Sequence, residues 1–291
     1  MRAVVQLRTL MKPRLTCVAI AALALARPVG AQQRPLVTED PEPVSSGSVL
    51  VEGGIDYARY LQYPVSGLKG HLWRVPTLGV SVGISSIAEL QIDGGFYNHL
   101  AITDRYSAPL SNLLTVTGDS THDVEDIVIG TKIRLLSESA KHPSFGFRFA
   151  TRLPNAGNES GLGLDTTDFY ASLLVAKTVQ SVRVVGNFGF GILADPTDGQ
   201  RQNDVVTYGL SFARAVTDQV ELVGEVNGRA STRSGTALPG TETRGLLKLG
   251  GRYTRGSVRL DAGVFLGLTV IDPTVGFTTG FTYVFNAFTI P

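Results

Sequence analysis

The chain has 291 residues, of which 26 are Lys or Arg and 25 are Asp or Glu, with 33 Gly and a single Cys. Charged residues make up 18% against about 25% in average globular proteins, which excludes a disordered polyanion and a coiled coil. One Cys and four His cannot build a zinc finger, and a net charge of +1 offers no basic surface, so the composition does not favour nucleic acid as a partner.

The first 31 residues hold five basic residues, no acidic residue and an apolar run from Thr16 to Ala26. This pattern is typical of a secretory signal peptide, and the small residues at 29–31 predict cleavage after residue 31. A retained anchor is the alternative, but the run is about 11 residues long and a spanning helix needs about 20. A start at Met11 gives a more compact signal than Met1. The expected mature chain, 32–291, has 21 basic against 25 acidic residues and no Cys.

Beyond residue 47, apolar residues recur at every second position, the period of a strand with one face in an apolar medium. In one of the clearest segments, Leu90 and Ile92 alternate with Glu89 and Asp93. Twelve strands are predicted, at 48–61, 72–84, 88–100, 124–136, 144–154, 168–178, 181–193, 205–216, 219–230, 244–254, 257–269 and 275–287.

The links between these segments alternate in length. Short links are expected at 85–87, 179–180, 217–218 and 255–256, with a somewhat longer one at 137–143. Longer polar links are expected at 62–71, 101–123, 155–167, 194–204 and 231–243, with a shorter one near Asp272. Short turns at one rim and long loops at the other are typical of an outer-membrane barrel. The prediction is therefore an all-β, antiparallel, up-and-down transmembrane β-barrel of about 12 strands over 48–291, in the outer membrane of a Gram-negative-type bacterium, with 32–47 as an N-terminal periplasmic segment.

A secreted β-sandwich is the alternative, because its strands also alternate. Against it, large apolar residues face one way in nearly every strand, while charges lie deep in the strands on the opposite face. Outer-membrane lipid on one side and water or ion pairs on the other would explain both features.

The last segment carries a polar residue, a glycine and two aromatic residues at the spacing recognised by the barrel-insertion machinery, which is thus an expected partner. The residues of this expected insertion signal are Thr278, Gly280, Tyr283 and Phe285.

Three loose motifs resemble the outer-membrane channel family named after the meta pathway of phenol degradation. They are Arg34, Pro35, Leu36, Thr38 and Asp40 ahead of Gly47; Asp126, Gly130 and Lys132; and Leu153 and Pro154 followed by Gly157, Gly161, Gly163 and Asp165. The resemblance covers most of the mature chain but departs from the family in the loop after Pro154. It implies a single-chain barrel that passes small solutes, apolar or aromatic ones by the family's name.

The alternation places charges of both signs on the inner face, so no strongly ion-selective pore is expected. The candidate lumen-lining residues are Lys132, Arg134, Arg148, Arg152, Arg183, Glu89, Asp93, Glu221, Glu225, Lys248 and Arg252. Glu221 and Glu225 are expected level with Arg252 and Lys248, and Glu89 and Asp93 near Arg134 and Lys132.

Twelve strands fall between a barrel filled by side chains and one with an open channel, which predicts a narrow, charge-lined or partly plugged passage. Arg148 and Arg152 either guide an anionic or aromatic solute or brace the wall. The residues leave open whether the segment before residue 47 hangs free or plugs the mouth.

The sequence favours a passive channel or transporter for small solutes, with a structural or surface-interaction barrel as the alternative. We expect no enzyme and no cofactor. Ser120, His122 and Asp123 are neighbours in an expected loop, which does not make a catalytic triad. Nearby carboxylates fit no calcium-loop motif, so no metal is expected.

Overall fold

A computed structural model describes residues 34–289, and the expected signal peptide and its cleavage position lie outside the described residues. The described chain folds into β-strands and a single short 3-10 helix. The elements are β1 (Ser48–Tyr63), β2 (Leu68–Gly83), β3 (Ala88–Gly95), β4 (Asn98–Arg105), β5 (Ser120–Asp123), β6 (Ile127–Leu136), β7 (Ser144–Leu153), η1 (Asn158–Ser160), β8 (Asp168–Val179), β9 (Val182–Asp195), β10 (Asp198–Ala215), β11 (Val220–Ser231), β12 (Arg244–Arg255), β13 (Val258–Gly267) and β14 (Val275–Asn286).

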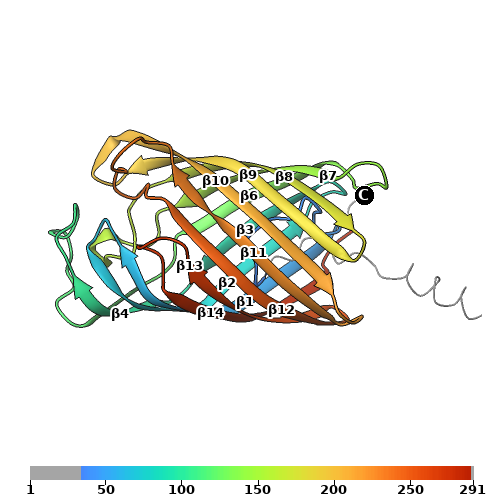
Figure 1. Cartoon of the computed structure of the whole chain (residues 1–291), viewed down its shortest axis with the longest axis horizontal. Helices are drawn as coiled ribbons and strands as arrows, with labels where there is room; N and C mark the ends of the chain where they lie inside the picture. Colours follow the sequence, from blue (N-terminus) through green and yellow to red (C-terminus); the bar gives the residue numbers. More distant parts are fainter. Residues whose placement is uncertain (1–33, 290–291) are drawn as a thin grey trace, which may run out of the picture. The chain divides into compact units, whose positions relative to one another are not determined.

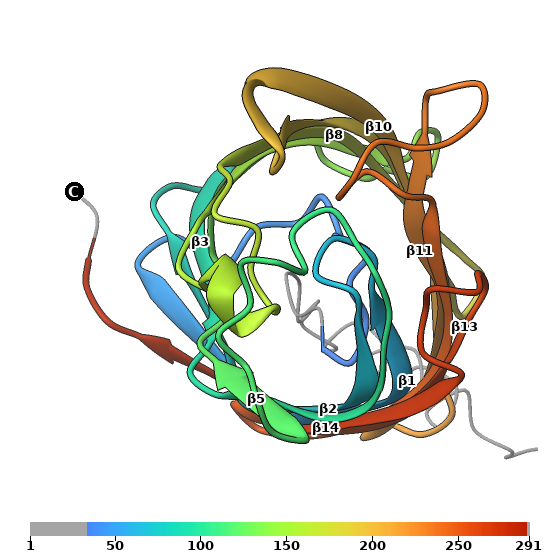
Figure 2. The same cartoon turned by 90° about the vertical axis from the view of Figure 1, so that its left-hand side faces the viewer.

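The strands form one closed antiparallel barrel (Figures 1 and 2). β1 pairs with β2 on one side and with β14 on the other, which closes the ring. β3 and β4 both pair with β2 and together make one wall strand that breaks at Phe96 and Tyr97. β5 pairs with β4, and β6 pairs with β3. β5 and β6 therefore also count as one strand of the wall. The fourteen segments therefore make twelve wall strands, and the predicted 12-strand barrel is confirmed.

The predicted strand boundaries differ most from the structure at the long-loop rim. The expected link at 62–71 is mostly strand, because β1 and β2 continue until four residues remain between them. The expected link at 194–204 is likewise a hairpin of β9 and β10. Beyond the membrane an apolar face is no longer required, so the two-residue alternation fades while the backbone ladder continues.

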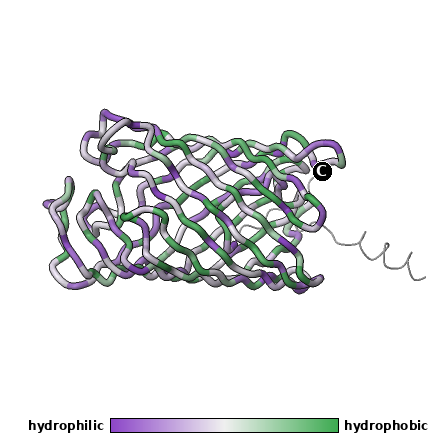
Figure 3. The backbone as a smooth tube through the Cα atoms, viewed as in Figure 1, coloured by the Kyte–Doolittle hydropathy of each residue, from purple (hydrophilic) through white to green (hydrophobic). Residues whose placement is uncertain are grey.

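Hydrophobic and hydrophilic residues alternate along the strands (Figure 3). The apolar ones are exposed on the outer face and the polar ones lie inside, the inverse of a water-soluble sheet protein. Phe188, Leu210 and Leu222 are 65%, 58% and 56% exposed, whereas the charged side chains of Glu89 and Lys132 are fully buried inside. Lipid is a suitable surrounding for such an apolar outer surface, and pairing between strands around the closed barrel satisfies the backbone hydrogen bonds. The fold is that of a barrel in a bacterial outer membrane.

No helix among residues 34–289 is long and apolar enough to span a membrane.

Candidate channel lumen

The N-terminal segment, residues 34–47, lies inside the barrel (Figure 2). Thr38 donates both its backbone N–H and its hydroxyl to the carboxylate of Glu225 on β11, each at 2.8 Å. The side chain of Asn187 on β9 accepts from the backbone N–H of Glu39 at 2.7 Å and donates to its carbonyl at 2.8 Å. The segment is thus bound to separate strands of the wall and occupies part of the lumen, which answers a question that the sequence left open.

Glu39 lies at the centre of a buried ion-pair cluster. Its carboxylate is 3.3 Å from Lys132 Nζ and 3.0 Å from Arg148 Nε. Lys132 also pairs with Glu89 at 3.0 Å, and Gln91 donates to both Glu39 and Glu89. Burial alone would raise the pKa of Glu39, but Lys132 and Arg148 outweigh burial, and this pKa lies below its ordinary value. Glu39 is therefore ionised at neutral pH and holds the segment electrostatically.

Two more carboxylates of the segment reach the basic wall. Asp40 accepts a two-point contact from the Arg183 guanidinium, at 2.7 and 2.8 Å. Glu42 accepts from Arg134. Bidentate arginine–carboxylate pairs fix orientation as well as adding energy, so the segment has a defined path along this wall.

Arg34 anchors the other end of the segment on the opposite side of the barrel. Its guanidinium donates to the hydroxyls of Thr278 at 2.9 Å and Thr77 at 3.0 Å, and it lies 3.5 Å from the carboxylate of Asp261. These partners belong to β14, β2 and β13. The segment is consequently held at both ends and crosses the lumen between them.

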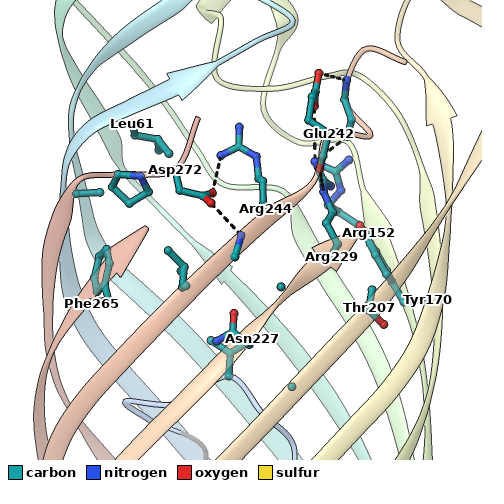
Figure 4. A pocket seen from close by; sticks show the side chains of 18 of the residues that line it. Leu61, Arg152, Tyr170, Thr207, Asn227, Arg229, Glu242, Arg244, Phe265 and Asp272 are labelled. Atoms are coloured by element: carbon teal, nitrogen blue, oxygen red, sulfur yellow. Dashed lines mark hydrogen bonds and ion pairs between the residues drawn. The ribbon is translucent and has the colours of Figure 1, made fainter. Parts of the chain in front are cut away.

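A chamber of about 620 Å³ lies between this segment and the long-loop rim. Figure 4 shows Leu61 and Phe265 on one side of it and Arg152, Arg229 and Tyr170 on the other. The apolar side belongs to a cluster of buried and half-buried side chains from β1, β2, β4 and β13. The chamber thus offers an apolar surface opposite guanidinium groups.

Loops cross the mouth of the chamber (Figure 2). The Ser66 hydroxyl, in the turn between β1 and β2, donates to the Gly161 carbonyl at 2.8 Å, and Leu110 N–H donates to the Val65 carbonyl at 2.9 Å. Hydrogen bonds between three loops narrow the opening at this rim.

Each predicted lumen residue takes part in an ion pair within the barrel. These residues are Lys132, Arg134, Arg148, Arg152, Arg183, Glu89, Asp93, Glu221, Glu225, Lys248 and Arg252. Arg148 contacts Glu39, and Arg152 contacts Asp126 and Asp168. Both arginines also line the chamber, so bracing and guiding a solute are compatible roles.

The expected pairing of charged residues between β11 and β12 is correct. Glu221 lies opposite Arg252 and Glu225 opposite Lys248 in the ladder, with ion-pair distances of 3.5 and 3.3 Å. β11 starts after a short connection at 216–219 and β12 ends before a short connection at 256–257, so positions counted from that rim of the barrel gave the register.

The next charges come from neighbouring strands as expected, but the expected heights, Glu89 with Arg134 and Asp93 with Lys132, are wrong. Glu89 lies opposite Lys132, but Asp93 lies opposite Val128 and is 3.8 Å from Arg148. Arg134 binds the N-terminal segment, outside the β3–β6 ladder. In the antiparallel ladder the partner of Asp93 is Val128, four residues before Lys132. The sequence did not give this register.

The sequence reasoning missed the acidic residues of the segment. Glu39, Asp40 and Glu42 precede a barrel whose inner face is rich in arginine, and that complementarity was the available signal. It also missed Asp168, the first residue of β8, which is fully buried and paired with Arg152.

The residues of the expected insertion signal lie on β14. Thr278 faces inward, where it accepts from Arg34, and Gly280 is opposite Gly54 of β1. Tyr283 and Phe285 are partly exposed on the outer face, with ring centroids 5.4 Å apart. Recognition by the insertion machinery stays a prediction.

Two carboxylates near the end of β5, Asp123 and Asp126, bind the loop that follows β7. Asp126 accepts from the backbone N–H groups of Asn155 and Ala156, both at 3.0 Å, and Asp123 accepts from Gly157 at 2.9 Å. Within residues 34–289 no cluster of His, Cys, Asp and Glu is arranged to hold a metal ion.

His122 lies on β5 opposite His99, and not in a loop as expected. Strand alternation places Ser120 and His122 on one face and Asp123 on the other, so the three do not converge.

No family model matches the sequence, and no curated protein matches it. Solved structures do match the fold. An outer-membrane channel from Pseudomonas putida F1 has a TM-score of 0.61 at 14% identity, with 84% of this chain and 98% of that chain covered. The NanC porin has a TM-score of 0.52 at 7% identity, with 81% of this chain and 98% of that chain covered. At these identities the likeness concerns the fold.

Proposed function

We propose that this barrel is a passive channel for small apolar or aromatic solutes, without enzymatic activity, and akin to the family named after the meta pathway of phenol degradation. The observation that carries the proposal is the chamber of about 620 Å³, which has apolar side chains on one side and arginines on the other. Its volume falls within the range of about 300–1,000 Å³ typical of small-molecule sites. The fold shared with an outer-membrane channel and a porin supports it.

For a solute to pass through the lumen, the N-terminal segment must move away from its position there. Besides the apolar packing of Val44 against Leu50, its contacts with the wall are hydrogen bonds and ion pairs, which can break and form again. A solute would enter through the narrowed mouth, rest against the apolar wall, and leave once the segment shifts.

A structural or surface-interaction barrel is the second candidate. It is favoured by the same segment and by the loops across the mouth, because together they restrict the lumen at two levels.

Swelling of liposomes that contain the purified mature chain separates the two functions. A channel gives swelling in benzoate that exceeds swelling in a sugar of similar size, whereas a sealed barrel gives neither. Leu246→Ala alters the chamber wall and should change the ratio of the two rates. Leu249→Ala, on the same strand but 51% exposed on the outer face, is the matched control and should leave the ratio unchanged.

A further inference from the structure

A cluster of cations lies on the outer face of the β1–β2 hairpin, apart from the lumen. The Arg59 guanidinium is 4.9 Å and the Lys69 ammonium 5.7 Å from the centroid of the Tyr60 ring. The His71 ring is 4.7 Å from the same centroid. Three nitrogen-bearing groups therefore gather around one aromatic ring.

The cluster faces outward by strand alternation. Ala58 and Leu68 are buried inside the barrel, so their neighbours Arg59 and Lys69 point to the opposite face. Arg59 is exposed and Lys69 is half-buried.

The height of the cluster matches the rim of the bilayer on the long-loop side. A membrane-spanning strand uses about 9 to 11 residues, so a span that starts at Ser48 ends near Arg59. Tyr57 and Trp73, with ring centroids 4.8 Å apart, lie just inside that level, as aromatic residues do at a membrane interface. Lys69 lies four residues beyond Trp73 toward the same rim. Long loops mark this rim as the extracellular one.

The two cations of the cluster have no carboxylate partner among residues 34–289. No Asp or Glu oxygen lies within 4.0 Å of either, in contrast to the arginines and lysines of the lumen. Asp104 is opposite Lys69 in the ladder, but its carboxylate accepts from the Thr103 hydroxyl at 3.1 Å. The charges of Arg59 and Lys69 are thus available to an external anion.

His71 can add a third donor. The backbone N–H of Tyr60 donates to His71 Nδ1 at 3.3 Å, which leaves the ring proton on Nε2. That tautomer carries an N–H group on a ring that contacts the same Tyr60 as the two cations.

We propose that Arg59, Lys69 and His71 bind a phosphate group of a phosphorylated glycolipid in the outer leaflet. Guanidinium and ammonium groups both favour phosphate oxygens, and contact with the Tyr60 ring restrains both cations. The lipid places its phosphate at the level of the headgroups, where the cluster lies. This inference rests on the membrane location of the barrel and not on transport.

Native mass spectrometry of the folded mature chain in detergent tests the assignment with three probes: diphosphorylated lipid A, the same lipid with both phosphates removed, and inorganic phosphate. The variant is Arg59→Gln with Lys69→Gln. Arg214→Gln is the matched control, because Arg214 is an exposed, outward-facing cation at the opposite rim. Arg59→Lys with Lys69→Arg keeps both charges.

A cation near an anionic lipid surface contributes about 1 kcal/mol, so each charge corresponds to about fivefold in affinity and the pair to about 30-fold. We expect the double variant to bind diphosphorylated lipid A about 30-fold more weakly, and the wild type to bind the phosphate-free lipid equally weakly. The control and the charge-keeping variant should bind like the wild type.

Equal binding of the two lipids, or no loss in the double variant, would overturn the proposal. Inorganic phosphate bound as tightly as the lipid would overturn the assignment to a lipid. A double variant that loses the native electrophoretic mobility is replaced by the two single variants, each expected to lose about fivefold, and unchanged affinity in both would also overturn it.

Discussion

The substitution Glu39→Gln tests whether ion pairs hold the N-terminal segment in the lumen. The carboxylate of Glu39 contacts Lys132 at 3.3 Å and Arg148 at 3.0 Å. Glutamine keeps the shape and an acceptor oxygen but removes the charge. A hydrogen bond to a charged group contributes about 1.5–3 kcal/mol and a neutral one about 0.5–1.5, so two contacts lose about 2 kcal/mol. The undocked fraction of the segment should then rise about 30-fold.

A cysteine reporter measures that fraction. Thr38 is 6% exposed, and the expected mature chain has no Cys, so Thr38→Cys gives a single buried thiol. A membrane-impermeant thiol reagent labels it only when the segment leaves the wall. With Glu39→Gln added, labelling should be about 30-fold faster.

The control is Asp198→Asn in the same reporter chain, which removes an equal charge from an exposed pair with Arg201 on the long-loop hairpin. Its labelling rate should not change. Equal rates with and without Glu39→Gln would refute the reasoning that this carboxylate holds the segment.

Three further predictions concern pH, a buried ion pair and the lipid face. Because the pKa of Glu39 is lowered from 4.5, its contribution to docking is present above that value and is lost as the pH falls through the lowered pKa. Wild-type solute flux should therefore rise more steeply below pH 4.5 than the flux through Glu39→Gln. Arg152→Gln leaves the fully buried Asp168 without its cation and should lower the free energy of unfolding by about 3 kcal/mol in urea titrations. Arg201→Gln should lower it less, because the Arg201 side chain is 51% exposed and water screens its pair with Asp195, which also accepts from Thr197. Leu210→Arg on the 58% exposed outer face should cost about 2–4 kcal/mol of folding free energy in lipid vesicles, and an unchanged value would contradict a lipid-facing position.

The strands could be predicted because the membrane imposes a strict alternation on each of them. Within the bilayer, Leu90 and Ile92 must face lipid while Glu89 faces inward. The sequence therefore shows the two-residue period of each strand and where its membrane-spanning part begins and ends. The hairpin extensions beyond the membrane carry no such constraint. The break at Phe96 and Tyr97 also went unseen, because a local interruption of pairing leaves the average period intact.

The candidate site could be predicted only where two neighbouring strands carry opposite charges at equal heights above the short-turn rim. Glu221 and Arg252 follow from the register of adjacent strands. The contact of Glu39 with Lys132 joins residues 93 positions apart, and no periodicity relates a segment inside the lumen to the wall around it. Complementary charge was the signal, but it does not specify which pairs form.

A reversible crosslink tests most directly the claim that solutes pass through the lumen by way of the N-terminal segment. A Cβ atom built at Gly209 would lie 3.4 Å from the Cβ of Thr38, close to the separation of about 3.5–4.5 Å in a disulfide. In proteoliposomes, Thr38→Cys with Gly209→Cys should lose benzoate flux when oxidised, down to the level of protein-free vesicles, and recover it on reduction. Equal flux in the oxidised and reduced states would contradict the account.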